Sequence, residues 1–497
     1  MSFIYQIKQL GKESFIYGFG SSLTQILTIL IAPILTQIFS PAEYGVLALV
    51  QSTFAILIML ASANIESGVF YYYYDEKESI NNQKKVIGTG FSYYLLASTS
   101  LALLCWISAP GINYLLSLRA ESATINYIPY IKILAVGSLF TMLSKYYQLL
   151  LRIQRQPIKY IFVGISQVFV QLSTILILVV YLDQGLTGIF MSNVIAAVIA
   201  MGVGLYFSRH ILTIQFSIHY FKRINSYSLP QFPSVIIQAL LNQSNRFFLN
   251  AFVPLTQLGY FAIAERYKGL YFIGVQAFIT AWGPYALSIM KEKCAKDIYK
   301  RVFDIYCLCF CILGITLSLL AKPIFMIFLS RDYIQGASIV FILILGAFFT
   351  GLNTILGIGI GITKQTKYIS YIQCIVFIIN LTLNFLLIPK LGMVGAAIAL
   401  AASFFSQTIL NYYISKKLYP IEYDYWPKVS LVLVCFSLSG LFIFLTWNFS
   451  IINTIALGTL LIWFITYLLI KISITPKQRQ YLVHTIVSYS KKRLLFN

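Results

Sequence analysis

The chain has 497 residues, of which 59% are hydrophobic and 10% are charged, and its mean hydropathy is +0.80. A water-soluble fold of this size could not cover its surface with so few charges, whereas a helix of roughly 20 apolar residues crosses a bilayer. The composition therefore excludes a water-soluble globular protein and predicts an all-α polytopic membrane protein.

Fourteen apolar segments of membrane-spanning length follow one another along the chain. The loops between them are short, so no soluble domain is inserted. The predicted spans are 15–39, 44–70, 86–108, 127–150, 160–181, 187–208, 229–253, 259–283, 299–321, 337–361, 368–388, 395–415, 429–447 and 452–472.

The formal net charge of +21 raises the question of nucleic-acid binding. However, 27 of the 36 basic residues fall in the N-terminal segment, in every second loop and in the C-terminal tail. Such an asymmetry sets membrane topology, so both termini are predicted to be cytoplasmic. We expect no nucleic-acid partner. Anionic membrane lipids are the expected partners of the basic loops and of the basic tail, 473–497.

Short sequence matches indicate an internal duplication. Residues 159–161 (KYI) match 367–369, and 185–188 (GLTG) match 392–395 (GMVG), at offsets of 208 and 207 residues. Chance matching in an apolar chain is the alternative explanation. Transporters are often built from such repeats, with the binding site between the two halves.

A weaker third match pairs 41–45 with 254–259, each at the start of a helix. Together the matches predict two six-helix bundles in the same orientation around a central cavity, followed by two further helices. The predicted divisions are 1–208 for the N-terminal bundle, 209–415 for the C-terminal bundle, 416–472 for helices 13 and 14, and 473–497 for a basic cytoplasmic tail.

Polar residues form a stripe on the seventh span, where Gln238, Asn242, Arg246 and Asn250 recur at every fourth position. Interhelical hydrogen bonds would explain the amides. Arg246 lies roughly 10 Å from the outer end at 1.5 Å per residue. It therefore either snorkels partly outward or faces a cavity.

The eighth span carries Glu265, Arg266 and Lys268. Glu265 and Lys268 share a face and could form an ion pair, while Arg266 points elsewhere. With Arg246, three cations meet one carboxylate, and an enclosed surplus of positive charge attracts anions. The hypothesis is a cationic lumen that binds substrate through Arg246, Arg266, Lys268, Asn242 and Lys145.

Lys145 and Glu66 have two open interpretations each. Lys145 lies near the inner end of the fourth span, so it either snorkels to the inner head groups or forms a basic entrance. Glu66, like Glu265, is a candidate ion-pair or coupling-ion residue. A proton or a sodium ion could serve, and the sequence leaves the choice open.

No catalytic constellation is evident, so an enzyme is not expected. Cys307, Cys309 and Cys311 do not share one helical face, and the histidines lie elsewhere in the sequence. No metal site and no cofactor are therefore predicted.

Five segments, in order along the chain, resemble the polysaccharide biosynthesis flippases of the multidrug/oligosaccharidyl-lipid/polysaccharide exporter superfamily. They are FSPAEYG (39–45), LPQFPS (229–234), LGYFAIAERYKG (258–269), DYIQGA (332–337) and NFLLIPKLGMVGAAIA (384–399). The resemblance implies two six-helix bundles in a V with a central cavity, plus helices 13 and 14, and alternating access in the bacterial inner membrane.

The resemblance also implies a substrate, an undecaprenyl-pyrophosphate-linked oligosaccharide repeat unit moved from the cytoplasmic to the periplasmic leaflet for O-antigen or a related polymer. A polysaccharide polymerase and a chain-length regulator are the protein partners it suggests. Two departures bear on ion coupling. Asn245 precedes Arg246 where many relatives have an acid, and residues 71–74 are tyrosines where relatives often have an arginine.

The alternative function is a multidrug or other cation-coupled antiporter of the same superfamily. That function would need a carboxylate in the first or seventh span to bind a cationic drug, and neither 15–39 nor 229–253 contains one. A peptidoglycan-precursor flippase would show arginines in the first span, which has none. A polymerase or glycosyltransferase would need long outer loops or acidic catalytic motifs.

Overall fold

The computed structural model describes residue 20 and residues 23–117, 125–365 and 367–473, and no strand occurs among them. In this part of the chain, eleven helices are long and apolar enough to cross a membrane. Shorter apolar helices run over Leu23–Ile38 and Ile451–Thr466. The prediction of an all-helical membrane protein is confirmed. The predicted basic tail at 473–497 lies, except for Ser473, outside the described residues.

The helices of the first half follow the first six predicted spans. They are α2 (Ile31–Ile38), α3 (Pro41–Ser62), α4 (Ile65–Asp75), α5 (Ile80–Ile107), α6 (Ala109–Leu116), α8 (Ile128–Ile153), α9 (Pro157–Ile175) with the π-helical turn η1 (Leu176–Tyr181), and α10 (Gly185–Ser208). A short helix, α11 (Ile218–Ser228), then leads into the second half.

The second half follows the remaining eight spans. Its elements are α12 (Phe232–Phe252), α13 (Leu255–Ser288), α14 (Ala295–Phe328), the 3-10 turn η2 (Arg331–Ile339), α15 (Val340–Leu356), α16 (Ile358–Ile362), α17 (Lys367–Leu391), α18 (Met393–Leu418), α19 (Tyr425–Leu445) and α20 (Ile451–Ser473). The helix α12 carries the polar stripe, and it is not among the eleven helices counted above.

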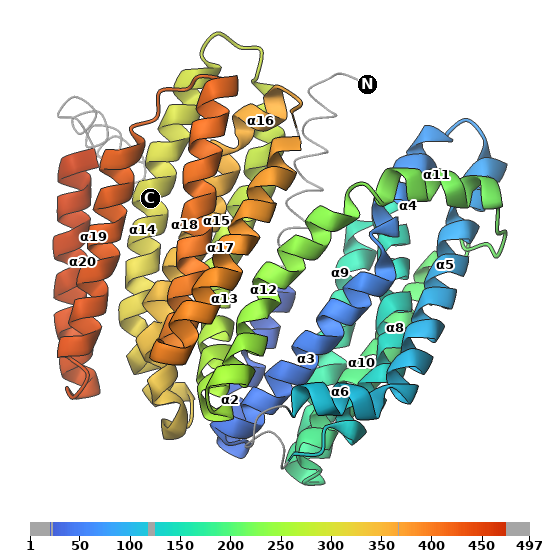
Figure 1. Ribbon diagram of the computed structural model, residues 1–497, viewed down its shortest axis with the longest axis horizontal. Coiled ribbons are helices and arrows are strands. Elements are labelled where there is room, and N and C mark those ends of the chain that lie inside the picture. The colour runs from blue at the N-terminus through green and yellow to red at the C-terminus, as the bar shows by residue number, and fades with distance from the viewer. Residues whose placement is uncertain (1–19, 21–22, 118–124, 366, 474–497) are drawn as a thin grey trace, which may run out of the picture.

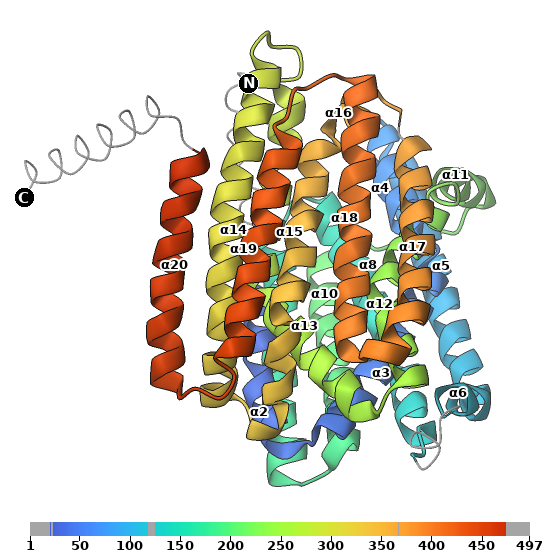
Figure 2. The same ribbon diagram turned by 60° about the vertical axis from the view of Figure 1, so that its left-hand side comes forward.

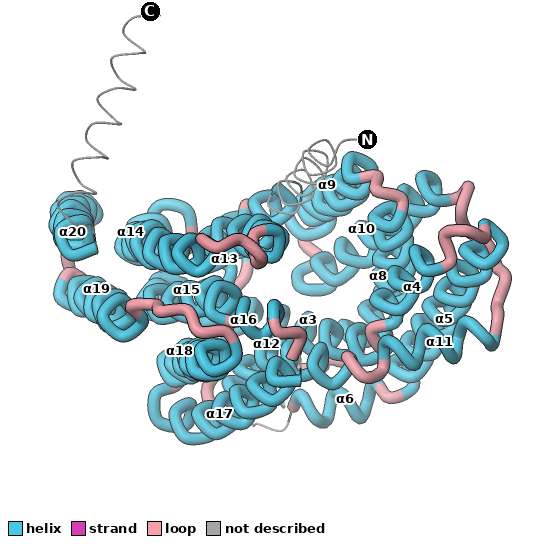
Figure 3. The backbone as a smooth tube through the Cα atoms, turned by 90° about the horizontal axis from the view of Figure 1, so that it is seen from above, coloured by secondary structure: helices cyan, strands magenta, loops and turns pink. Residues whose placement is uncertain are grey.

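The helices form a V. In Figure 1 the helices of the two halves diverge toward the end that carries α11 and α16, and they converge toward the end that carries α2. In the view from above, α19 and α20 lie at the edge of the second half that is farthest from the first (Figure 3). Figure 2 shows α20 on the outside, next to α14 and α19.

The matched motifs of the two halves lie at helix starts. Gly185 begins α10 with φ +55°, and Gly392 precedes α18 with φ +57°. This left-handed backbone favours glycine, because a β-carbon would clash with the following carbonyl. Residues 159–161 lie near the start of α9, which begins at Pro157, and Lys367 begins α17. The division of the chain at residues 208 and 415 stays a prediction.

A buried amide network joins three helices of the second half. Asn384 Nδ2 donates to Asn245 Oδ1 at 2.8 Å and to Asn380 Oδ1 at 3.0 Å. Ser244 Oγ donates to the same Asn380 oxygen, and Asn380 Nδ2 donates to Ser403 Oγ. Buried polar groups of this kind hold helices together in lipid. The face of α12 that carries Ser244 and Asn245 therefore packs against other helices of the second half. A different face of α12 can line a cavity.

Lys322 fastens the last two helices to the rest of the second half. Its side chain is buried, and Nζ donates to the carbonyl oxygens of Thr446, Trp447 and Phe449 at 3.1, 2.6 and 3.2 Å. These carbonyls belong to the end of α19 and the turn before α20. A cation at this place offsets the partial negative charge of a helix C-terminus.

Candidate functional site

A cavity of about 580 Å³ lies between helices of the two halves. Its walls come from residues 24–29 and α3 of the first half, and from α12, α13, α15 and α18 of the second. The uncharged polar residues that line it are Thr24, Gln25, Thr28, Gln51, Gln238, Asn242, Gln243 and Thr350. This volume is in the range of ordinary ligand pockets.

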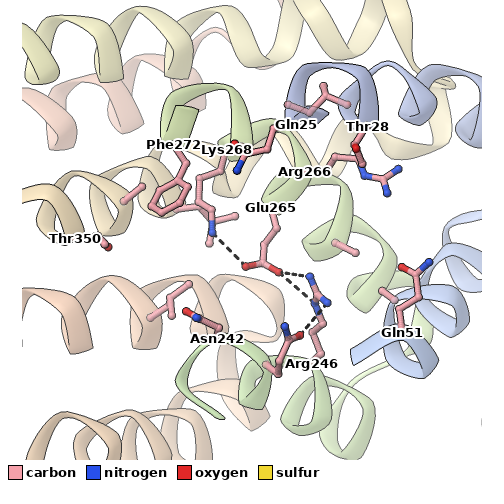
Figure 4. A pocket seen from close by; sticks show the side chains of 18 of the residues that line it. Gln25, Thr28, Gln51, Asn242, Arg246, Glu265, Arg266, Lys268, Phe272 and Thr350 are labelled. Carbon is pink, nitrogen blue, oxygen red and sulfur yellow. Dashed lines mark hydrogen bonds and ion pairs between the residues drawn. The ribbon is translucent and has the colours of Figure 1, made fainter. Parts of the chain in front are cut away.

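Glu265 lies between two cations in this cavity (Figure 4). Arg246 Nη2 and Nε donate to Glu265 Oε2 at 2.8 and 3.2 Å, and Lys268 Nζ donates to Oε1 at 3.3 Å. The turn at Val253 and Pro254 folds α12 and α13 into a hairpin, which brings Arg246 opposite Glu265. Lys268 reaches the same carboxylate because it is one turn further along α13.

Arg246 also bonds across the boundary between the halves. Its Nη1 donates to Ser52 Oγ on α3 at 2.6 Å and to Gln243 Oε1 at 3.1 Å. The guanidinium therefore has three different acceptors, one of them 194 residues away in the sequence. Most of its hydrogen-bonding capacity is used within the protein.

Arg266 points away from this cluster, toward Thr28 (Figure 4). Its Cζ lies 5.8 Å from the centre of the Tyr44 ring. Within the described part of the chain, the Arg266 Nη1 is buried without a hydrogen-bond partner, and so is the Tyr44 Oη. Arg266 therefore keeps donors that the fold does not use.

The cavity brings together five of the seven residues predicted to bind substrate or to act as ion-pair or coupling carboxylates: Asn242, Arg246, Glu265, Arg266 and Lys268. Three cations thus meet one carboxylate among its described lining residues. The side chains of this cluster are only partly exposed, 21% for Arg246 and Lys268 and 11% for Glu265, so their charges are screened less than charges on an open surface.

Lys145 and Glu66 lie outside the described cavity lining. The Lys145 side chain is exposed on α8. Glu66, in the first turn of α4, accepts a hydrogen bond from the buried Tyr94 hydroxyl. Their roles as a basic entrance and as a coupling carboxylate remain predictions.

Sequence reasoning missed several residues of the site, among them Tyr44, Gln51 and Ser52. The polar run from Gln51 to Thr53 within an otherwise apolar helix was a usable signal. Tyr44 belongs to the FSPAEYG segment, and its position in the cavity wall depends on how α3 packs against α13. No group of three or more His, Cys, Asp or Glu side chains that could hold a metal occurs among the residues that the structure describes.

The family model "Polysaccharide biosynthesis protein" matches residues 34–338, which is more than half of the chain. The chain belongs to the polysaccharide biosynthesis protein family. The matched region includes every cavity residue from α3, α12 and α13. Among curated protein sequences, no match to this polysaccharide biosynthesis protein is found.

Solved transporter structures share the fold of this polysaccharide biosynthesis protein. The lipid II flippase MurJ in an inward closed conformation has a TM-score of 0.72 at 14% identity, and the match covers 92% of this chain and 99% of MurJ. An inward-facing multidrug resistance MATE family transporter of the MOP superfamily has a TM-score of 0.67 at 13% identity, with 79% and 94% covered. The Vibrio cholerae MATE transporter VcmN has a TM-score of 0.58 at 16% identity, with 82% and 97% covered.

At these identities the likeness concerns the fold alone. The chain has the fold of MOP-superfamily transporters, as its resemblance to polysaccharide biosynthesis flippases implied. It is a multi-pass membrane protein of a polysaccharide biosynthesis family.

Proposed function

We propose that this protein is a flippase for lipid-linked oligosaccharides. Its substrate is an undecaprenyl-pyrophosphate-linked repeat unit of O-antigen or a related surface polysaccharide. The protein moves this substrate from the cytoplasmic to the periplasmic leaflet of the bacterial inner membrane by alternating access, with both termini in the cytoplasm.

The observation that carries the proposal is the charge of the cavity. Arg246, Arg266 and Lys268 outnumber the single carboxylate of Glu265 among the described lining residues. Cations at membrane depth are costly unless a partner or a ligand compensates them, and they are usually functional. A diphosphate is an anion that guanidinium and ammonium groups bind well.

The uncharged part of the lining suits the sugar part of such a substrate. Gln25, Gln51, Gln238, Asn242 and Gln243 present amides, each of which can donate and accept hydrogen bonds. Sugar hydroxyls need both kinds of partner. The membership of the chain in a polysaccharide biosynthesis family supports the same substrate class.

The test is complementation in cells that lack the protein. The variants are Arg246→Gln, Arg266→Gln and Lys268→Gln, and the matched control is Lys390→Gln, an exposed cation outside the cavity. We expect each cavity variant to reduce surface polysaccharide at least several-fold and to cause lipid-linked precursor to accumulate, with the control unchanged. Normal polysaccharide from all three cavity variants, at equal protein levels, would overturn the proposal.

The fold shared with MATE family transporters supports a second candidate, a multidrug or other cation-coupled antiporter. The positive surplus in the cavity would repel a cationic drug, which makes this function the weaker one. The two are separated by drug susceptibility. Expression that raises resistance to cationic drugs, without an effect on surface polysaccharide, would favour the antiporter.

Three further assignments belong to the same proposal. Glu66 and Glu265 are the candidate carboxylates for a coupling proton or sodium ion, and Lys145 is a candidate for the basic entrance. A polymerase and a chain-length regulator are the proposed protein partners, because the repeat unit must be assembled into a polymer after it is moved.

A further inference from the structure

Two buried donors in the cavity wall are unused. Arg266 Nη1 and Tyr44 Oη have no hydrogen-bond partner among the residues that the structure describes. Tyr44 is only 3% exposed, and the Arg266 Cζ lies 5.8 Å from the centre of its ring. A buried polar group without a partner destabilises the fold, and more so when it is charged. Two such groups side by side therefore need an explanation.

The neighbouring cations, Arg246 and Lys268, do have hydrogen-bond partners within the protein. Arg246 donates to Glu265, Ser52 and Gln243, and Lys268 donates to Glu265. An anion that approached them would compete with a carboxylate already in place. Arg266 has no acidic partner within ion-pair distance among the described residues, so its charge is available to a ligand.

We propose that Arg266 and Tyr44 form a phosphate-binding subsite, separate from the cluster of Arg246, Glu265 and Lys268. This inference rests on the flippase function proposed above and assigns one part of the substrate to one part of the cavity. The guanidinium supplies charge and N–H donors that match phosphate oxygens, and the phenol supplies a further donor. The Tyr44 ring, in turn, supports the guanidinium through a cation–π contact.

The subsite lies next to the contact between α3 and α13. Tyr44 immediately precedes Gly45, whose α-carbon faces the backbone of Leu255 at the start of α13. The Tyr44 ring also packs edge-on against Tyr333, with 5.8 Å between ring centres, and Tyr333 Oη donates to the carbonyl of Phe39. A phosphate held by Arg266 and Tyr44 would therefore lie at the end of the V where the two halves converge.

The carboxylate of an acidic sugar is the other oxyanion that this substrate class could place here. The two sources are distinguished with separate probes, inorganic pyrophosphate and glucuronate. Pyrophosphate carries more charge and more acceptor oxygens than a single carboxylate, so the subsite is expected to prefer it.

The experiment measures the dissociation constant of each probe by calorimetry, with the full-length protein in lipid nanodiscs. We expect Arg266→Gln to weaken pyrophosphate binding about tenfold or more, since it removes a charge-assisted hydrogen bond. Tyr44→Phe, which removes one hydroxyl, should weaken it by about threefold to tenfold. The matched control is Tyr267→Phe, whose hydroxyl donates to the carbonyl of Leu317 and not to a ligand.

Thermal unfolding without ligand supplies a second readout, which a purely structural role would not produce. Arg266→Gln removes a partly buried charge that has no acidic partner among the described residues, so the free protein should be as stable as wild type or more stable. Arg246→Gln should be less stable, because it leaves Glu265 with one cation fewer. A stable Arg266→Gln variant that binds pyrophosphate poorly would support the subsite.

Two results would overturn the subsite. One is unchanged pyrophosphate affinity in both Arg266→Gln and Tyr44→Phe while Arg246→Gln loses binding, which would leave the flippase proposal standing. The other is preferential binding of glucuronate that Arg266→Gln abolishes, which would assign the subsite to an acidic sugar. Failure of the flippase proposal itself is recognised separately, by normal surface polysaccharide in the complementation assay.

Discussion

Gly45 and Gly259 let α3 and α13 touch backbone to backbone at the converging end of the molecule. A β-carbon on Gly259 would overlap the carbonyl oxygen of Pro41, and one on Gly45 would overlap that of Leu255. The two glycines end the matched segments 41–45 and 254–259. The contact therefore joins these two matched segments beside the cavity.

Replacing Gly259 by alanine is expected to force these two helices apart. Overpacking of this kind costs about 1–3 kcal/mol, which should appear as a lower thermal unfolding temperature of the purified protein. The matched control is Gly274→Ala on the same helix, where a β-carbon would meet only ordinary contacts at 3.6 Å with Leu313 and Phe310. Equal stability of the two variants would show that the contact is not tight.

Glu265→Gln is expected to separate anion binding from stability. It leaves Arg246 and Lys268 without their carboxylate, so the free protein should unfold at a lower temperature. The same change frees two cations for a ligand, so pyrophosphate should bind several-fold more tightly, as measured by calorimetry. Weaker pyrophosphate binding in a folded variant would mean that Glu265 itself orients the site.

Lys322→Met should loosen the last two helices without affecting the cavity. It removes three charge-assisted hydrogen bonds to the turn between α19 and α20. Hydrogen exchange of the amides in α19 and α20 should accelerate, while pyrophosphate affinity stays unchanged. Lys390→Met is the control, since the Lys390 side chain is exposed. Exchange that is as slow as in the control would exclude an anchoring role.

Acid should weaken the attachment of α11 to α4. Arg223 on α11 forms ion pairs with Glu76 and Asp75 at the end of α4, at 2.7 and 3.1 Å. The Asn82 amide, and then the Arg223 guanidinium, hold the pKa of the Glu76 carboxyl below its ordinary value of 4.5. A lowered pKa in the folded state means that the stabilisation is present above pH 4.5 and is lost as the pH falls through the folded value.

The measurement is hydrogen exchange in α11 as a function of pH, corrected for the intrinsic exchange rate. Protection in the wild type should fall below about pH 4.5, and protection in Glu76→Gln should be lower at neutral pH and change less with acid. An identical pH profile in the two proteins would contradict the assignment to Glu76.

The number and order of the spans could be predicted because the membrane imposes a local rule. A helix in lipid needs a continuous apolar segment of fixed length, and that length can be read within each segment. Each of the fourteen predicted spans overlaps a helical segment in the part of the chain that the structure describes, which includes only residues 20 and 23–39 of the first span. The glycines that begin α10 and precede α18 were likewise visible as matched motifs.

Part of the site could also be predicted, because it depends on residue spacing within single helices. The four-residue spacing of Asn242 and Arg246 places them on one face of α12, and the three-residue spacing of Glu265 and Lys268 does the same on α13. These relations hold for any helix, whatever surrounds it. The sequence by itself therefore determined which side chains lie together on each helix, and that positive charge exceeds negative charge there.

Only the tertiary structure decided what those faces meet. Ser52 accepts a hydrogen bond from Arg246, which is 194 residues away in the sequence. The Tyr44 ring lies against the Arg266 guanidinium. Lys145 and Glu66 lie outside the described cavity lining. The rotation of one helix against another depends on packing between segments far apart in the chain. The spacing of residues within a single helix gives no information about that packing. For that reason the sequence identified Arg266 as a charge without a clear partner, and the fold placed it against Tyr44.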